Sequence, residues 1–301
     1  MNRMSPESTI VANKLALVFV LGACTSHTRP VHPHAAGAPL SLAADERMIA
    51  IPAGMFIAGS TPEERGQAYD DYAQTAGSDA ARERRWFDRE EERRQLPLPA
   101  YRIDLMPVTQ SQFAEFVQAK GAPAPTIDEP AWKAQGFAQD YATEVARFVW
   151  KDDRPPAGRE DHPVVLVTWD EAAAYCKWRG DLVGHARRLP TAHEFERAAR
   201  GDKGVIYPWG NAFEPERLNS AVNGPKDTVP VGSNLEGKSP HGVLGTAGNV
   251  FQWTSTPFPP DEMTVKGSAW EDFAGVGRGA SAHGRPKSAR HVIVGFRCAS
   301  D

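Results

Sequence analysis

The stretch that decides the fold is HGVLGTAGNVFQWT, residues 241–254. Within it, Gly248 and Asn249 directly precede an apolar run that contains Phe251 and Trp253. Glycine tolerates positive φ angles, asparagine adopts them more readily than most residues, and large rings stabilise a fold when they are buried. The pattern therefore predicts a tight turn that leads into an element with buried aromatic side chains.

Six further motifs surround this stretch in a fixed order. They are MIAIPAGMFIAGS (48–60), HPVVLVTWDEAAAYCKW (162–178), RRLPTAHEFERAARG (187–201), YPWGN (207–211), VPVGS (229–233) and GFRCASD (295–301). With these motifs the chain resembles the formylglycine-generating enzyme family, also called the sulfatase-modifying factor family. The resemblance covers residues 48–301 and implies an irregular, C-type-lectin-like architecture.

Composition limits the class of protein. The chain has 301 residues, a formal net charge of -4 and a pI near 6.2. This length fits one mixed domain with a leader, and the absence of a basic field argues against nucleic acid as a partner. The 26 glycines, 25 prolines and 8 tryptophans indicate a loop-rich fold whose core holds large rings.

The N-terminal region carries a compartment signal. Arg3 and Lys14 precede the apolar run LALVFVLGA, which ends at Cys24. A run of about nine residues is too short to span a bilayer and fits a signal peptide. The boundary Leu-Gly-Ala-Cys resembles a bacterial lipoprotein signal, so we expect residues 1–23 to be removed and Cys24 to carry lipid. The alternative is an ordinary secretory peptide with an incidental cysteine.

Residues 24–47 are rich in Pro, Gly, Ala and Ser, which predicts a flexible tether between the anchor and the domain. Thr25 and Ser26 follow Cys24, with no aspartate to indicate retention in the inner membrane. We therefore expect a protein of the bacterial cell envelope that is lipid-anchored in the outer membrane and faces the periplasm.

Residues 62–95 form an insertion dense in Asp, Glu and Arg that ends in RERRWFDREEERRQ. Such mixed charges are compatible with an exposed helix, and the insertion is longer than the resemblance implies at this place. We interpret it as a solvated helical flap. In the alternative, Trp86 and Phe87 anchor it to the body of the domain, and it is a candidate partner-binding feature.

Three threonines predict helix starts, because each is followed three residues later by Gln or Glu in a capping box. The helices begin after Thr109, Thr168 and Thr191, and we expect them to end at Gly121, Gly180 and Gly201. A few capped helices among many short strands, without a repeated βαβ pattern, predict an α+β fold. The resemblance narrows this fold to the formylglycine-generating-enzyme type.

The cysteine count predicts one disulfide. If Cys24 is lipidated, Cys176 and Cys298 remain, and an envelope location permits them to pair. They lie in AYCKW and GFRC, where the resemblance implies a structural disulfide. Their separation of 298 - 176 = 122 residues gives a loop-entropy contribution of roughly 4 to 5 kcal/mol. Two buried free thiols are the alternative.

The same count argues against the family's oxidase chemistry. In copper-dependent members, two further cysteines shortly after a GGSF or GGSW motif bind the metal. The corresponding region here is VKGSAWEDFAGVGRGASAHGR, residues 265–285, and no cysteine lies between Cys176 and Cys298. Soft Cu(I) needs thiolate ligands, which Glu271 and Asp272 do not supply. We therefore expect a divergent member without copper.

The carboxylates that follow Trp270 define a candidate pocket. We expect Glu271, Asp272 and Arg278 to form a polar ligand-binding surface where active relatives hold their metal cysteines. Adjacent Glu271 and Asp272 would supply an acid and a base if burial separates their pKa values; two exposed loop carboxylates are the other interpretation. The full candidate set is Trp253, Ser268, Trp270, Glu271, Asp272, Arg278 and His283.

The sequence gives weaker support for an iron site or a calcium site. Iron-dependent relatives use histidines, but the histidines here show no compact ligand motif. The resemblance also implies two calcium sites, a first from Asn219, the Ser220 carbonyl and Asp227, and a second from Gly248, Val250 and Gln252. Calcium prefers several oxygen ligands that include carboxylates. Gln252 stands where relatives have Glu, and Gly245 where they have Asn or Asp, so the second site is weak or absent.

Two functions follow from this pattern. The first is a non-catalytic envelope module that binds a protein or peptide, since the framework motifs are kept and the metal cysteines are lost. The second is an oxidoreductase with altered chemistry, as in relatives associated with siderophore maturation.

Overall fold

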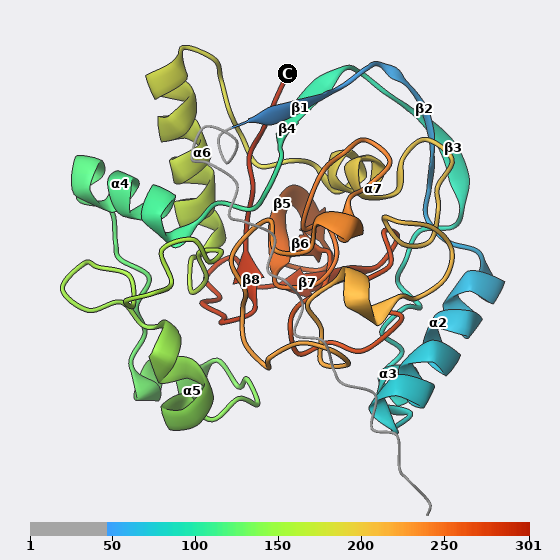
Figure 1. The fold of residues 1–301 in the computed structure, drawn as a ribbon, viewed down its shortest axis with the longest axis horizontal. Helices are drawn as coiled ribbons and strands as arrows, with labels where there is room; N and C mark the ends of the chain where they lie inside the picture. The colour runs from blue at the N-terminus through green and yellow to red at the C-terminus, as the bar shows by residue number, and fades with distance from the viewer. Residues whose placement is uncertain (1–46) are drawn as a thin grey trace, which may run out of the picture. The chain divides into compact units, whose positions relative to one another are not determined.

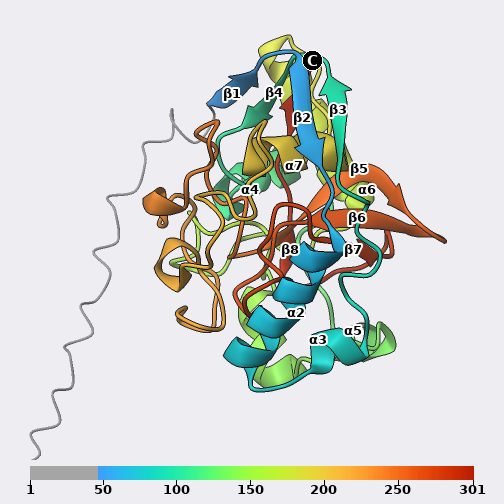
Figure 2. The same ribbon diagram turned by 90° about the vertical axis from the view of Figure 1, so that its right-hand side faces the viewer.

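The computed structural model describes residues 47–301 (Figures 1 and 2). The expected signal peptide, the expected lipidation site Cys24 and the expected tether up to residue 46 lie outside these residues. In the described part of the chain, no helix is long and apolar enough to cross a membrane.

Three small sheets hold the strands of residues 47–301. The first is antiparallel with β4 at its centre, the second is a two-stranded ribbon, and in the third β8 runs parallel to β5 while the other pairs are antiparallel. The first sheet holds β1 (Met48–Ile51), β4 (Tyr101–Asp104) and β9 (Ala299–Ser300); the second holds β2 (Gly54–Ala58) and β3 (Arg94–Leu98); the third holds β7 (Ala282–Arg285), β6 (Glu262–Lys266), β5 (Phe251–Phe258) and β8 (Val294–Gly295).

The predicted helix starts are confirmed. The side chains of Thr109, Thr168 and Thr191 each accept a hydrogen bond from the backbone N–H three residues later, and the Gln or Glu at that position bonds back. These caps begin α4 (Gln110–Lys120), α6 (Trp169–Val183) and α7 (Ala192–Arg200). A fourth capping box, at Thr61 and Glu64, begins α2 (Pro62–Ala76) and was not predicted.

Gly121 and Gly201 end their helices as predicted, but the prediction for Gly180 is wrong. Helix α6 continues to Val183 and ends at Gly184, whose φ is 70°. Gly180 lies inside the helix, where an added Cβ would be 2.6 Å from the backbone nitrogen of Arg187. The residue is therefore glycine because the returning chain passes close to the helix, and not because the helix ends there.

The remaining helical pieces are short, and long stretches between them have no regular structure. These pieces are α3 (Ala80–Glu83), α5 (Glu129–Ala134), η1 (Tyr141–Val145), η2 (Ala146–Phe148), η3 (Pro215–Arg217) and η4 (Leu235–Gly237). Few helices, short strands and extensive irregular backbone confirm the predicted α+β class.

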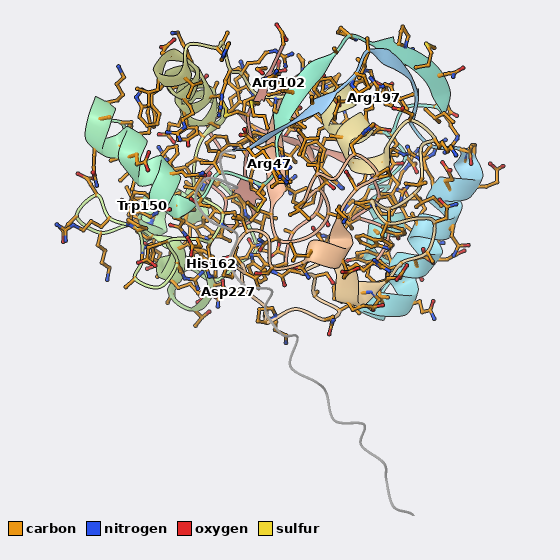
Figure 3. All side chains as sticks on the ribbon, turned by 45° about the horizontal axis from the view of Figure 1, so that its top comes forward. Arg47, Arg102, Trp150, His162, Arg197 and Asp227 are labelled. Atoms are coloured by element: carbon orange, nitrogen blue, oxygen red, sulfur yellow. A yellow bond between two sulfur atoms is a disulfide. The ribbon has the colours of Figure 1, made fainter. Side chains whose placement is uncertain are left out.

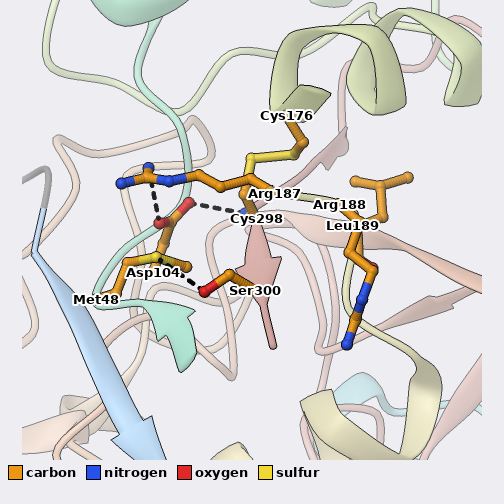
Figure 4. Close-up of a disulfide and its surroundings, with 8 residues drawn as sticks. All are labelled: Met48, Asp104, Cys176, Arg187, Arg188, Leu189, Cys298 and Ser300. Atoms are coloured by element: carbon orange, nitrogen blue, oxygen red, sulfur yellow. Dashed lines mark hydrogen bonds and ion pairs between the residues drawn. A yellow bond between two sulfur atoms is a disulfide. The ribbon is translucent and has the colours of Figure 1, made fainter. Parts of the chain in front are cut away.

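A buried cluster of aromatic rings joins α4 and α6 to the C-terminal segment. The ring of Phe113 stacks on Tyr175 with centroids 5.7 Å apart and meets Phe296 edge-on at 6.1 Å. Close to this cluster the predicted disulfide is confirmed: Cys176 of α6 is bonded to Cys298, with Cα atoms 5.5 Å apart (Figure 4). The bond ties α6 to the residue that precedes β9.

The charged insertion packs on the domain along both of its halves, so the interpretation of a solvated flap is wrong. Phe87 is fully buried and its ring lies 4.8 Å from that of Tyr69. Trp86 packs edge-on against Tyr72 at 5.4 Å. Glu90, although charged, is also buried. Tyr69 and Tyr72 belong to α2 of the insertion itself. Three contacts reach residues outside it: Trp86 with His283 at 6.3 Å, Tyr72 with Phe273 at 5.7 Å, and Phe87 with the Arg278 guanidinium at 4.7 Å. These contacts anchor the insertion to the body of the domain.

Candidate functional site

The candidate site lies in the loop that follows β6. Ser268 begins this loop, and its hydroxyl accepts a hydrogen bond from the backbone N–H of Gly248 at 2.8 Å. On the neighbouring strand β5, the indole N–H of Trp253 donates to the carbonyl of Val167 at 3.1 Å, and the ring is fully buried. Ser268 thus ties the loop to Gly248, and Trp253 ties β5 to Val167; both side chains are buried.

Glu271 and Asp272 are partly buried in this loop. Burial raises the pKa of Asp272 to about 7, and the charge of Glu271 adds to that effect. Burial also raises the pKa of Glu271, although a hydrogen bond from the Gln139 amide, 2.8 Å from Oε1, opposes the shift. The pair is therefore not two ordinary exposed loop carboxylates, since burial raises the pKa of both carboxyl groups.

Three residues linked to the two carboxyl groups, by sequence, hydrogen bond or charge, carry buried polar atoms without a hydrogen-bond partner. The Trp270 indole nitrogen, the Gln139 amide oxygen and the Arg285 Nε are buried without a hydrogen-bond partner. Gln139 also binds Glu271, and the charge of Arg285 acts on both carboxyl groups. Buried polar groups without partners are rare and costly in folded proteins. This group, called the Glu271–Asp272 site below, therefore retains hydrogen-bonding capacity for a ligand or ordered water.

The prediction that Arg278 forms a ligand-binding surface with Glu271 and Asp272 is wrong. The Arg278 guanidinium is buried and bonds the Glu90 carboxylate, with Nη1 3.1 Å from Oε2. Its Nε donates to the Gly275 carbonyl at 2.8 Å. Arg278 thus fastens the charged insertion to the loop after β6 and is not available to a ligand.

His283 contributes packing and no charge. Its ring meets Phe251 at 5.3 Å and Trp86 at 6.3 Å, both edge-on. Burial, aided by the nearby positive charge of Arg285, lowers the pKa of His283 to about 3. The imidazole is therefore neutral at physiological pH and takes no part as a cation in binding.

The sequence analysis missed Gln139 and Arg285. Arg285 could have been found, because His283 and Arg285 are two residues apart in β7 and side chains alternate along a strand. Gln139 lies between α5 and η1, in a stretch with no regular pattern, and nothing in the sequence connects it with Glu271.

Metal ligands do not converge in the described residues. No group of three or more His, Cys, Asp or Glu side chains between residues 47 and 301 is arranged to hold a metal ion. The remaining histidines are dispersed: His291, for example, is buried against the ring of Phe137 at 4.1 Å. The histidines considered in the sequence analysis were His162, His185, His193, His241, His283 and His291.

The first expected calcium set does not fit the ion. The Asp227 carboxylate already binds Arg159, with Nη1 2.9 Å from Oδ1, and Asp227 lies beside His162 (Figure 3). Burial alone would raise the pKa of Asp227, but this hydrogen bond and charge hold it below its usual value. Asn219 Oδ1 is buried and unpaired, while the Ser220 carbonyl accepts from the backbone N–H of Gly224 at 2.7 Å. A calcium ion would have to displace the guanidinium of Arg159.

The second expected calcium set does not fit the ion either. The side-chain oxygen of Gln252 accepts from the Nε of Arg297 at 2.6 Å, and its side-chain Nε2 donates to the backbone carbonyl of Gly245 at 2.8 Å. The Gly248 carbonyl accepts from the backbone N–H of Val250. This set supplies no carboxylate, and the Gln252 and Gly248 oxygens already have partners, so we derive no step of the function through calcium.

Comparison with known proteins identifies the family. Residues 38–301 match the sulfatase-modifying factor enzyme 1-like domain. The chain belongs to the sulfatase-modifying factor family. Inactive C-alpha-formylglycine-generating enzyme 2 of Mus musculus is 29% identical over 307 residues, covering 87% of this chain and 88% of that protein. Hercynine oxygenase of Mycolicibacterium smegmatis is 28% identical over 261 residues, covering 75% of this chain and 58% of that protein.

A solved structure has the same fold as this chain. PvdO from Pseudomonas aeruginosa superposes with a TM-score of 0.62 at 19% identity, covering 84% of this chain and 94% of that chain. The likeness confirms the predicted formylglycine-generating-enzyme fold. The similar family members thus include one named as inactive and one named as an oxygenase.

Proposed function

We propose that the chain is a non-catalytic binding module of the sulfatase-modifying factor family that holds a protein or peptide in the bacterial envelope. One observation carries this proposal. After Trp270, where the family's copper ligands are expected, the chain has Glu271 and Asp272, and the cysteines of the described residues are joined in the buried disulfide. Without thiolates, Cu(I) has no soft ligands at this place.

The chemistry of the Glu271–Asp272 site supports a peptide as the ligand. A peptide group presents one hydrogen-bond donor and one acceptor. The site holds unpaired donors on Trp270 and Arg285 and an unpaired acceptor on Gln139. Ligand amides that satisfy these atoms would remove the cost of leaving them unpaired.

The envelope location belongs to the same proposal. Its support is the leader with the Leu-Gly-Ala-Cys boundary, together with a disulfide, which forms and persists mainly outside the cytoplasm. Cys24 would hold the chain to the outer membrane through lipid, and the domain would face the periplasm.

A second candidate is an oxidoreductase with altered chemistry. The specific support is the pKa of Asp272, which burial raises to about 7, near the value that suits a general acid or base at neutral pH. The relative named hercynine oxygenase adds that oxygen chemistry is associated with some members of this family.

One experiment separates the two candidates. The purified chain is analysed for bound copper and iron, and its oxygen consumption is measured on thiol peptides. The binding proposal expects neither metal at near-stoichiometric occupancy and no turnover. In parallel, Glu271→Gln with Asp272→Asn should weaken recovery of an envelope partner, while Arg85→Gln, an exposed change elsewhere, should not. Stoichiometric metal with turnover would overturn the proposal.

A further inference from the structure

A second cavity, separate from the Glu271–Asp272 site, lies between the β5–β6 hairpin, the start of α7 and the end of the charged insertion. Figure 2 shows the hairpin in orange-red at the right-hand edge of the molecule, near α7. The cavity has a volume of about 430 Å³, within the range of roughly 300–1,000 Å³ typical of small-molecule sites. We call it the Lys266 cavity.

Lys266 lies at the wall of this cavity yet is itself 1% exposed. Its ammonium group donates to Glu196 Oε2 and to the Ala280 carbonyl, both at 3.1 Å. An ammonium group has three donors. Two of them therefore have partners in the described residues, and one is left for a ligand.

The buried network behind Lys266 carries one excess positive charge. Glu196 also binds the Arg200 guanidinium at 3.0 Å and the backbone N–H of Gly59 at 2.8 Å. Burial alone would raise the pKa of Glu196, but the charges of Lys266 and Arg200 hold it below its usual value. One carboxylate thus faces two buried cations, and an unbalanced buried charge is costly unless an anion neutralises it.

The rim adds a second positive charge. Arg89 is exposed, donates to the Pro259 carbonyl and lies 4.2 Å over the ring of Phe258, but it has no carboxylate partner among residues 47–301. The acidic rim residue Glu91 is already paired with Arg94 and His193. The charged groups around the cavity therefore favour an anion.

The remaining wall is apolar and includes the ring of Phe258 with Pro257 and Pro259. Ala192, the first residue of α7, also lines the cavity, so the positive end of that helix dipole lies at its wall. A ligand that fits both features carries a negative group at one end and an apolar body at the other.

We propose that the Lys266 cavity binds a carboxylate attached to an apolar group, with the carboxylate on Lys266 and Arg89 and the apolar part against Phe258. A free aromatic acid and the C-terminal end of a peptide share this chemistry. The cavity does not include Glu271 or Asp272, so this proposal stands or fails independently of the proposed function.

The test is a calorimetric titration of the purified chain with benzoate, N-acetylphenylalanine and N-acetylphenylalaninamide. Both acids should bind. The amide, in which a neutral carboxamide replaces the carboxylate of the second acid, should bind at least roughly tenfold more weakly, as expected for loss of a charge-assisted hydrogen bond. If N-acetylphenylalanine binds more tightly than benzoate, the source is a peptide end; the reverse indicates a free acid.

Substitutions test whether the acids bind in the Lys266 cavity. Lys266→Met and Arg89→Gln should each weaken binding of the acids about tenfold or more. Arg85→Gln, an exposed change in the same insertion, should leave it unchanged. If Lys266→Met does not fold, Arg89→Gln decides, because Arg89 is exposed. Equal binding of acid and amide, no effect of Arg89→Gln, or no binding of either acid at millimolar concentration would overturn the proposal.

Discussion

Arg278 and Glu90 form a buried ion pair between segments 188 residues apart, with Nη1 of Arg278 3.1 Å from Oε2 of Glu90. Both side chains are almost completely removed from solvent. The hydroxyl of Ser60 also donates to Glu90 at 2.6 Å. This pair explains why the charged insertion packs against the domain although its sequence is typical of a solvated helix.

Arg278→Met should destabilise the domain by about 3–5 kcal/mol, because it leaves a buried carboxylate without its charged partner. Denaturant unfolding measures the change. The double variant with Glu90→Gln should cost less than the sum of the single changes, since the two residues are coupled. Arg85→Gln, which breaks an exposed pair with Asp88, is the control and should leave the midpoint unchanged. Additive effects at Arg278 and Glu90 would contradict the coupling.

Replacing both Cys176 and Cys298 by alanine should lower the free energy of unfolding by about 2–5 kcal/mol, because the long loop between them is then free in the unfolded chain. Peptide mapping without reductant should recover both cysteine peptides of the wild type as one species. Two free thiols in the oxidised, folded protein would refute the assignment.

The stability of the wild type should fall with rising pH relative to Asp272→Asn. Burial raises the pKa of Asp272 from 3.8 to about 7, so the folded chain keeps a proton that the unfolded chain releases between these values. The contribution of this proton to the free energy of unfolding is complete below about pH 4. It is lost as the pH rises towards 7, at about 1.4 kcal/mol per pH unit. Asparagine can still accept the hydrogen bond that Ala269 N–H now donates to Asp272. Unfolding curves at pH 5 and pH 8 measure the difference, and parallel pH profiles for the two proteins would exclude it.

Calcium should shift the unfolding midpoint of the wild type little, because the guanidinium of Arg159 occupies the Asp227 carboxylate. Arg159→Gln frees this carboxylate and should increase the response to calcium over a chelator control. Thermal unfolding with calcium or with chelator measures both. A large shift in the wild type that disappears in Asp227→Asn would show that the ion displaces Arg159.

Mass spectrometry of the processed chain should find a lipid on Cys24 as the first residue, leaving 301 - 23 = 278 residues. Cys24→Ala should release the chain from the membrane fraction, because no other anchor is expected from the leader. A mature N-terminus elsewhere without lipid would contradict this prediction.

Local signals predicted more of this fold than of its site. The capping boxes at Thr109, Thr168 and Thr191 involve residues three positions apart, so the sequence itself contains both partners. The family motifs, in turn, predicted the disulfide between Cys176 and Cys298.

The errors arise where an element meets residues outside it, close or far along the chain. Gly180 resembled a helix end because the close approach of Arg187 cannot be read from the helix alone. Arg278 resembled a ligand-binding residue because its partner Glu90 lies in an insertion that the motifs do not cover. Gln139 was missed for the same reason, since its contact with Glu271 spans 132 residues.

The placement of the C-terminus affects the order in which this chain can fold. Residues 291–300 are all buried, β9 pairs with β4, and the Arg297 guanidinium bonds the carbonyls of Asp104, Leu105, Leu244 and Gly245. Residues 291–300 follow in the chain all of these partners, so they can join them only after the partners have been synthesised. A chain that stops before residue 291 should therefore lack the centre of the domain and be more exposed to proteolysis.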